Sequence, residues 1–296
     1  MQVEKNNVVR IGVRILVAGL ACWSLLYGPT AGAQTTAATP VPRCTKLVAT
    51  GNPEYAPYLW RDAQQPSVLV GANADLMQWL AKEIGIPIQT RYAGSWARVQ
   101  EEVRAGRVDL IAGAFLTVPR LEYMDYFYPV FRTTRTVIWT RKQDKFTYKK
   151  WDDLRNRKGL TVINNSFGDA FDRYAKANLK LDAVPMLEQA YRMLAVGRVD
   201  YVIYEEDPGI AFAGMLKYHD FATSKVSVSN EGLYLTMSHL SPCNTPEVRG
   251  RIAKALYKLN QGKTMDRLIA TNIERWRHNA TPPPSMLATP APDAPH

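Results

Sequence analysis

Gly106-Arg107-Val108-Asp109 recurs 91 residues later as Gly197-Arg198-Val199-Asp200, and an apolar stretch follows each copy. In both places the pattern indicates a helix that ends at the glycine, because glycine readily takes the left-handed conformation found just past helix C-termini. A polar pair then turns the chain into an apolar strand. Two copies of this helix–turn–strand unit predict two lobes that are built alike.

Strands and helices alternate on both sides of the first copy. Apolar periodicity and bounding Gly or Pro residues predict strands at 45–49, 86–92 and 108–112 and helices at 74–84 and 97–105. This alternation is typical of the α/β class with a largely parallel sheet. Ligands of open α/β sheets bind beyond the carboxyl ends of the strands, so the residues after each copy are candidates for a binding site.

Composition limits the functional classes. Of the 296 residues 46% are apolar and 22% are charged, which is close to the globular average and excludes a collagen-like, coiled-coil or wholly disordered chain. The formal net charge is +10, but no block of five or six like charges occurs. The sequence therefore does not favour a nucleic-acid partner.

Residues 1–33 have the pattern of a secretory signal peptide. Lys5, Arg10 and Arg14 precede an uncharged apolar stretch at 15–27, and small residues follow at Ala31-Gly32-Ala33. We expect cleavage after Ala33. The alternative is an uncleaved membrane anchor, but the apolar stretch is shorter than the roughly 20 residues that a bilayer span needs.

The mature chain would keep two cysteines, Cys44 and Cys243. An even count in an oxidising compartment favours a disulfide, and we predict that the two pair; the alternative is two buried free thiols. Residues 280–296 are rich in Pro and Ala without periodicity, which predicts a disordered tail.

Opposite charges follow the two copies of the repeated unit. Arg120 ends the segment after the first copy, and Glu205 lies directly after the second. Facing each other across a cleft, a guanidinium and a carboxylate offer what an α-amino acid requires, a bidentate donor for its carboxylate and an anion for its ammonium. The alternative is that both are ordinary surface charges.

Seven motifs occur in a characteristic order between residues 44 and 277. They are Thr50–Tyr58, Gly71–Leu76, Trp96, Gly113–Arg120, Trp151–Leu154 with Lys158-Gly159, Asn165–Gly168, and Gly197–Glu205. In this order they resemble the polar amino-acid-binding proteins of bacterial ABC importers, which are extracellular solute-binding proteins of family 3.

The resemblance implies a periplasmic-binding-protein-like fold of type II. Two lobes, each with a mixed, mostly parallel sheet flanked by helices, would be joined by two hinge crossovers. Lobe 1 would comprise residues 44–134 and 232–279, and lobe 2 residues 135–231, with hinges near Thr133-Thr134 and Asn230-Glu231.

The implied function is that of a periplasmic, monomeric binding protein. It would capture an amino acid or a close analogue between the lobes and deliver it to the membrane permease of an ABC importer or to a chemoreceptor. The resemblance implies no catalysis, no cofactor and no metal.

The resemblance also implies roles for single residues. Tyr55 and Trp96 would flank the ligand, the Gly113 carbonyl would accept from its amine, and the Phe115 amide and the Arg120 guanidinium would donate to its carboxylate. For the two flanking aromatic residues the alternative is ordinary core packing.

In the second lobe the resemblance matches Ser166 to a hydroxyl residue at the start of a helix and Glu205 to the amine-binding acid. Ser166 also has capping-box spacing to Asp169, and a helix N-terminus is a ready anion site. Glu205 replaces the usual Asp and is one methylene longer, so the ligand position is expected to shift.

Three further departures concern the ligand. Asn52 stands where proteins for basic amino acids carry Asp, so lysine and arginine are not favoured. Phe115 replaces the usual Ser or Thr, and Asn165 replaces a Gly. We expect a less polar pocket than is usual in the family.

Two competing functions remain open at this point. Some relatives are dehydratases of prephenate or arogenate that use a cleft carboxylate as general acid, and Glu205 or Glu206 could act in this way. The sequence shows no nucleophile, metal or nucleotide motif in support of an enzyme. The other alternative is a sensory binding protein that presents its ligand to a receptor.

Overall fold

The computed structural model describes residues 44–279, so the predicted signal peptide (1–33) and tail (280–296) lie outside the described residues. The strands are β1 (Leu47–Thr50), β2 (Glu54–Tyr55), β3 (Leu59–Arg61), β4 (Leu69–Val70), β5 (Ile88–Thr90), β6 (Leu110–Ala114), β7 (Met124–Tyr126), β8 (Arg132–Arg141), β9 (Lys158–Val162), β10 (Lys180–Val184), β11 (Tyr201–Glu205), β12 (Phe221–Thr223) and β13 (Ser229–Ser238). The α-helices are α1 (Ala72–Ile84), α2 (Trp96–Arg104), α3 (Asp169–Asn178), α4 (Leu187–Ala195), α5 (Glu206–Met215), α6 (Pro246–Asn260) and α7 (Thr264–Asn279).

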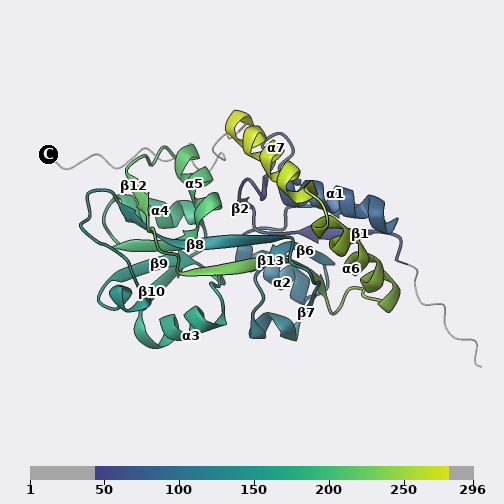
Figure 1. The fold of residues 1–296 in the computed structure, drawn as a ribbon, viewed down its shortest axis with the longest axis horizontal. Coiled ribbons are helices and arrows are strands. Elements are labelled where there is room, and N and C mark those ends of the chain that lie inside the picture. Colours follow the sequence, from purple (N-terminus) through teal and green to yellow (C-terminus); the bar gives the residue numbers. More distant parts are fainter. Residues whose placement is uncertain (1–43, 280–296) are drawn as a thin grey trace, which may run out of the picture. The chain divides into compact units, whose positions relative to one another are not determined.

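One mixed sheet follows the path β10-β9-β11-β8-β13-β6-β1-β5 (Figure 1). Strands β5, β1 and β6 are parallel to one another, and so are β10, β9 and β11. We call these two groups, with the helices that cover them, the first half and the second half. The long antiparallel strands β8 and β13 join the halves, which confirms the predicted α/β class.

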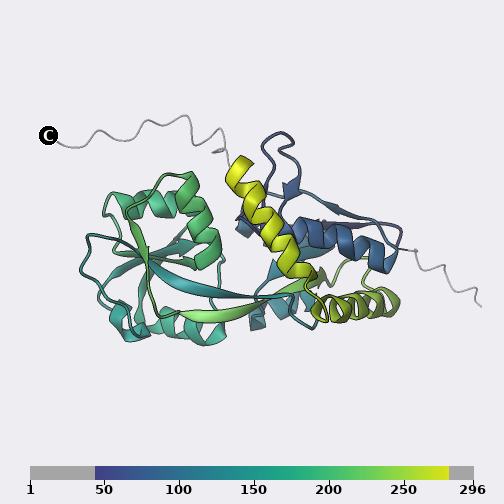
Figure 2. The same ribbon diagram turned by 45° about the horizontal axis from the view of Figure 1, so that its top comes forward.

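Helices cover both faces of each half. Figure 1 shows α4 and α5 on one face of the second half and α3 on the other, and Figure 2 shows the same layering from a second angle. In the first half α1 packs against α6 and α7, while α2 lies on the opposite face. The resulting cores are apolar and leave the strand ends of both halves free to form a site.

Helix α1 shows how the local sequence determines an element. Leu76, Met77, Leu80 and Ile84 are buried and recur at helical spacing. The helix ends at Gly85, whose φ of 69° is left-handed. The predicted helix is therefore confirmed, and it begins two residues earlier than expected, at Ala72.

The repeated unit has the predicted conformation in both copies. Gly106 and Gly197 follow α2 and α4 with φ of 70° and 73°. The two aspartates of the repeat also have equivalent roles. The Asp109 carboxylate accepts from the backbone N–H of Val48 near the start of β1, and the Asp200 carboxylate accepts from the backbone N–H of Lys158 at the start of β9. Both distances are 2.7 Å. The similarity of the copies thus extends to how each ties two parallel strands together.

The other sequence-predicted elements of the first half are present with shifted ends. The strand predicted at 86–92 is confined to Ile88–Thr90, and that predicted at 108–112 runs from Leu110 to Ala114. The helix expected at 97–105 is α2, Trp96–Arg104.

Cys44 and Cys243 form a disulfide, which confirms the predicted pairing. Their Cα atoms lie 4.9 Å apart, although 199 positions separate them in the sequence. The bond ties the segment before β1 to the segment before α6. No helix within residues 44–279 has the length and apolar character that a membrane span requires.

The two segments predicted as hinges are neighbours in the sheet. Thr133 lies opposite Gly232, and Thr134 lies opposite Glu231, in the antiparallel pairing of β8 with β13. The lobe boundaries and the movement about these segments stay predictions.

Candidate functional site

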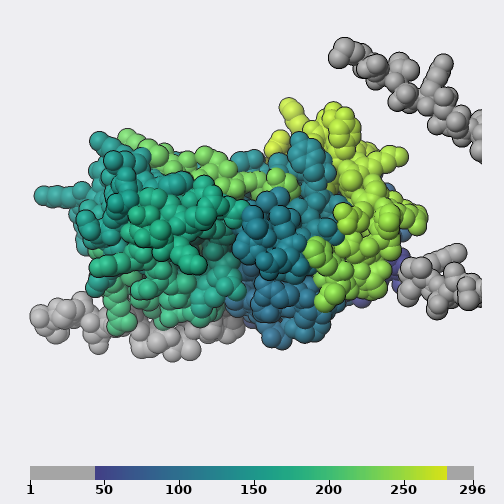
Figure 3. Space-filling model, turned by 90° about the horizontal axis from the view of Figure 1, so that it is seen from below, coloured from purple at the N-terminus to yellow at the C-terminus, as the bar shows by residue number. Residues whose placement is uncertain are grey.

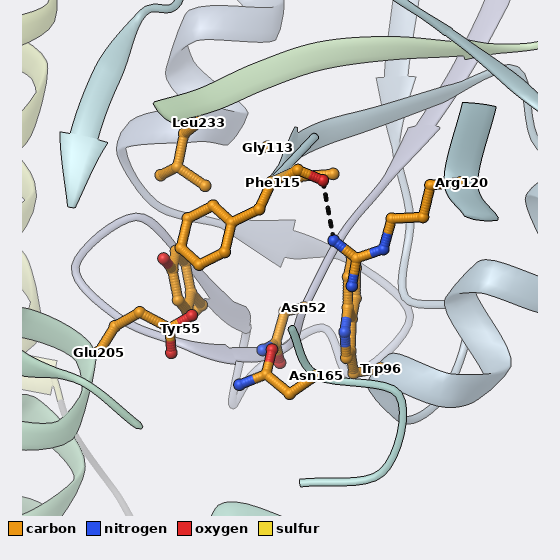
Figure 4. A pocket seen from close by; sticks show the side chains of 10 residues that line it. Asn52, Tyr55, Trp96, Gly113, Phe115, Arg120, Asn165, Glu205 and Leu233 are labelled. Atoms are coloured by element: carbon orange, nitrogen blue, oxygen red, sulfur yellow. Dashed lines mark hydrogen bonds between the residues drawn. The ribbon is translucent and has the colours of Figure 1, made fainter. Parts of the chain in front are cut away.

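A pocket lies between the two halves, beyond the carboxyl ends of β1, β6, β9 and β11 (Figure 4). It is lined by Asn52, Tyr55, Trp96, Gly113, Ala114, Phe115, Arg120, Asn165, Glu205 and Leu233. This position agrees with the general placement of ligand sites in open α/β sheets. The structure therefore brings together every sequence-predicted ligand residue except Ser166.

Ser166 does not line the pocket. Its hydroxyl donates to the carboxylate of Asp172 and accepts from the Gly168 N–H at 3.3 Å. Helix α3 has Gly168 as its N-cap with no side-chain cap, so the predicted capping box of Ser166 with Asp169 is wrong. The reason is that Asp172, one turn further along, bonds both the Ser166 hydroxyl and the Phe167 N–H.

Arg120 is buried on the pocket wall, with 5% of its surface exposed. Its guanidinium donates to the carbonyl of Phe115 at 2.9 Å and to that of Asn164 at 3.0 Å, and it lies 5.3 Å from the centre of the Trp96 ring. Both hydrogen-bond partners are neutral. The guanidinium can therefore replace one of these carbonyl acceptors by the carboxylate of a ligand, which is a stronger hydrogen-bond acceptor.

The Asn164 carbonyl joins the two halves. Besides Arg120 it accepts from Trp96 Nε1 and from Gln100 Nε2, both at 3.2 Å. Asn164 has a left-handed φ of 60°, in the loop after β9. Three donors of the first half therefore converge on one backbone oxygen of the second. Sequence reasoning missed Gln100, although its position one helical turn after Trp96 places both on the same face of α2.

Glu205 lies at the end of β11 with 2% of its surface exposed. Burial raises the pKa of its carboxyl to about 7, while the neighbouring Asn165 amide and, more weakly, Arg120 act to lower it. Among the described residues its Oε2 atom has no hydrogen-bond partner. A cation placed beside this carboxylate would stabilise its charged form.

Two amide side chains lie between the charged groups (Figure 4). Asn52 donates to the Tyr204 hydroxyl at 3.1 Å and accepts from the Glu54 N–H at 3.0 Å, so it helps to hold the halves together. The sequence marks Asn165 only as a departure from the family pattern. Its side chain lies on the pocket wall beside the Glu205 carboxylate, and its hydrogen bond acts to lower the pKa of that carboxyl.

The apolar side of the pocket consists of Phe115, Tyr55 and Leu233, and Trp96 lies on the opposite side with Arg120 (Figure 4). The cavity between them has a volume of about 20 Å³, room for about one water molecule. Figure 3 shows the halves meeting along a narrow recess. In this arrangement of the halves the cavity is therefore too small for an amino acid.

Further hydrogen bonds join the halves beside the pocket. Glu54 of β2 accepts from the Leu187 N–H at the start of α4 at 3.0 Å, and the Tyr58 hydroxyl donates to Asp207 at 2.7 Å. Burial raises the pKa of Glu54 to about 7, because its carboxylate is removed from water. Within residues 44–279 no group of three His, Cys, Asp or Glu residues is arranged to hold a metal ion.

Solved structures with the same fold are similar to this chain. A substrate-binding protein of an amino acid ABC transporter, AbpA from Streptococcus pneumoniae, bound to L-arginine, is 23% identical, with a TM-score of 0.66 over 78% of this chain and 96% of that one. A histidine kinase sensor domain with similarity to periplasmic binding proteins is 21% identical, with a TM-score of 0.66 over 77% and 96%. An ancestral arginine-binding protein bound to glutamine is 19% identical, with a TM-score of 0.64 over 78% and 97%.

A search of curated protein sequences finds no match to the chain. The family model of bacterial extracellular solute-binding proteins, family 3, however, matches residues 47–275, which is nearly all of the described fold. This chain belongs to the bacterial extracellular solute-binding proteins of family 3.

Proposed function

We propose that this protein is a monomeric, periplasmic binding protein that captures an α-amino acid between its lobes and delivers it to the permease of an ABC importer. One observation carries the proposal. Arg120 and Glu205 are buried, oppositely charged and on the walls of one pocket, and neither takes part in a salt bridge among the described residues. Buried charges without charged partners are costly, and a zwitterion supplies a partner to each.

The proposed binding mode combines the positions of Arg120 and Glu205 on the pocket wall with the backbone roles that the family resemblance implies for Gly113 and Phe115. The ligand carboxylate bonds Arg120 and the Phe115 N–H, and the ligand ammonium bonds Glu205 and the Gly113 carbonyl. Because the cavity holds about one water molecule, the lobes 44–134 with 232–279 and 135–231 open about the Thr133-Thr134 and Asn230-Glu231 segments before the ligand enters.

The comparisons support an amino acid as the ligand class. One structural neighbour is bound to L-arginine and another to glutamine. The predicted signal peptide and the disulfide support the periplasm as the location. We propose no catalysis, although a buried carboxyl with a pKa of about 7 is also suited to a general acid, so the test includes the two dehydratase substrates.

The test is a thermal-shift panel on the secreted chain, refolded to remove carried-over ligand. It includes the twenty L-amino acids, prephenate and arogenate. Ligand at 100 times Kd stabilises by about 2.7 kcal/mol, a shift of roughly 5–10 °C for a domain of this size. We expect a shift with one or a few amino acids. A response to, or turnover of, prephenate or arogenate alone would favour the dehydratase.

Two arginine variants locate the site. Arg120→Ala is expected to weaken binding about 10- to 150-fold, the loss of a charged hydrogen bond. Arg104→Ala removes a surface guanidinium that pairs with Glu101 at 2.7 Å outside the pocket, and it should bind as the parent does. Equal affinity of Arg120→Ala and the parent would contradict the site assignment.

A further inference from the structure

A second cavity lies within the second half, at the opposite end of its strands from the pocket that contains Arg120 and Glu205. It has a volume of about 270 Å³ and is lined by Arg141, Asp144, Lys145, Phe146, Arg157 and Asp200. Asp200 directly precedes β11 and Glu205 ends it, so at about 3.3 Å per residue the two sites are roughly 16 Å apart. The volume is near the lower end of the range for small-molecule sites, about 300 Å³.

The charges that line this second cavity favour an anion. Arg141 and Asp144 largely neutralise each other, because the guanidinium donates to one carboxylate oxygen at 3.2 Å and lies 3.1 Å from the other. The two remaining cations, Lys145 and Arg157, form no ion pair within residues 44–279. Two cations therefore face the cavity against the single carboxylate of Asp200, and they would attract a negatively charged ligand.

Arg157 is held in a conformation that suits anion binding. Its guanidinium carbon lies 3.8 Å from the centre of the Phe146 ring. A guanidinium that stacks by its flat face keeps its N–H groups, which lie in the plane, available to an acceptor. No side-chain hydrogen bond of Arg157 occurs in the described part of the chain. Its planar donor set can therefore bind two oxygens of a phosphate or carboxylate group.

The two copies of the Gly-Arg-Val-Asp unit differ at this cavity. In the first copy Asp109 accepts from the Val48 N–H through Oδ2 and from the Ser241 hydroxyl through Oδ1, the latter at 2.6 Å. In the second copy Asp200 accepts from the Lys158 N–H through Oδ2, but no group among residues 44–279 bonds its Oδ1 atom. Because Asp200 lines the cavity, a ligand hydroxyl there can take the role that Ser241 has in the first copy.

We propose that the second cavity binds a small hydroxylated dianion, of the polyol phosphate or hydroxydicarboxylate class. Its anionic groups bind Arg157 and Lys145, and its hydroxyl donates to Asp200. A dianion matches the two unpaired cations, and the hydroxyl gives the Asp200 carboxylate a donor in place of a like charge. This site is separate from the pocket of the proposed function and does not depend on it.

The experiment is calorimetric titration of the secreted, refolded chain with two matched pairs of small molecules. L-malate is compared with succinate, which lacks the hydroxyl, and glycerol 3-phosphate with glycerol, which lacks the charge. We expect L-malate or glycerol 3-phosphate to bind with a Kd below about 1 mM. Succinate should bind about 2- to 10-fold more weakly than L-malate, since one hydrogen bond is missing. Glycerol should not bind.

Two arginine variants test the role of Arg157. Arg157→Gln should weaken dianion binding about 10- to 150-fold, the loss of a charged hydrogen bond. The matched control is Arg155→Gln. Arg155 also lies over an aromatic ring, 5.7 Å from the centre of Tyr174, but it pairs with Asp152 at 2.9 Å outside the cavity. This control should bind the dianion as the parent does.

The outcomes distinguish this site from the pocket of the proposed function. If neither dianion binds, or if Arg157→Gln binds as the parent does, the second site is overturned. If succinate binds as tightly as L-malate, the role of Asp200 is overturned. Arg120→Ala should keep the dianion affinity of the parent. If Arg120→Ala abolishes dianion binding instead, the dianion occupies the Arg120 pocket and the second site is again overturned, while amino-acid binding is tested separately by the thermal-shift panel.

Discussion

Glu54 gives the most quantitative prediction, because it is buried at the contact between the halves. Its Oε2 atom accepts from the Leu187 N–H at 3.0 Å, and its Oε1 atom has no hydrogen-bond partner within residues 44–279. Burial raises the pKa of this carboxyl from 4.5 to about 7. Between these two pH values the folded chain holds a proton that the unfolded chain has released.

The sign of the pH effect follows from this difference. Since the folded state binds more protons, the free energy of unfolding decreases as the pH rises from 4.5 to 7. Each pH unit corresponds to about 1.36 kcal/mol, so the rise of the Glu54 pKa from 4.5 to about 7 corresponds to about 3 kcal/mol. Glu205, with a pKa also raised to about 7, adds a contribution of similar size.

The assay is urea denaturation followed by circular dichroism at several pH values from 4.5 to 7.5. Glu54→Gln, which cannot ionise, should show a decrease in unfolding free energy that is about 3 kcal/mol smaller than the parent's. The matched control is Glu83→Gln, because Glu83 pairs with Lys258 at 2.8 Å on the surface, away from the pocket. Equal pH dependence of Glu54→Gln and the parent would refute the argument that burial of Glu54 weakens the fold at neutral pH.

Three further predictions concern the disulfide, a glycine and the affinity for ligand. Replacing Cys44 and Cys243 together by Ser should lower the free energy of unfolding by about 2–5 kcal/mol in urea, because the bond closes a loop across 199 positions. Gly113→Ala should cost about 1–3 kcal/mol in the same assay, because φ is +117° and a Cβ would lie 2.9 Å from the Asn73 amide nitrogen. Amino-acid affinity should fall about tenfold per pH unit below pH 7, since the ammonium requires the ionised form of Glu205; a pH-independent Kd in calorimetry would contradict this.

Elements with a strong local pattern could be predicted from the sequence. The apolar spacing of α1 and the glycine that ends it are local signals, and so are the two Gly-Arg-Val-Asp copies, whose glycines have the expected left-handed φ. Ser166 could not be placed in this way. Spacing alone offers Asp169 as its partner, whereas Asp172, one turn later, bonds it once the loop has folded.

The pocket residues were recognisable where they directly follow strands, as Phe115 and Glu205 do. The groups that join the halves were harder to predict. A backbone carbonyl such as that of Asn164 has no sequence signature, and Gln100 becomes a partner only when the halves are in contact. The small volume of the pocket likewise depends on how the two halves meet, which no local pattern encodes.

The most direct measurement is a crystal structure of the protein with the tightest-binding amino acid of the panel. The account predicts the ligand carboxylate on the Arg120 guanidinium and the Phe115 N–H, and the ligand ammonium on the Glu205 carboxylate, between halves closed around it. A ligand bound elsewhere, or one whose carboxylate does not contact Arg120, would contradict the central claim.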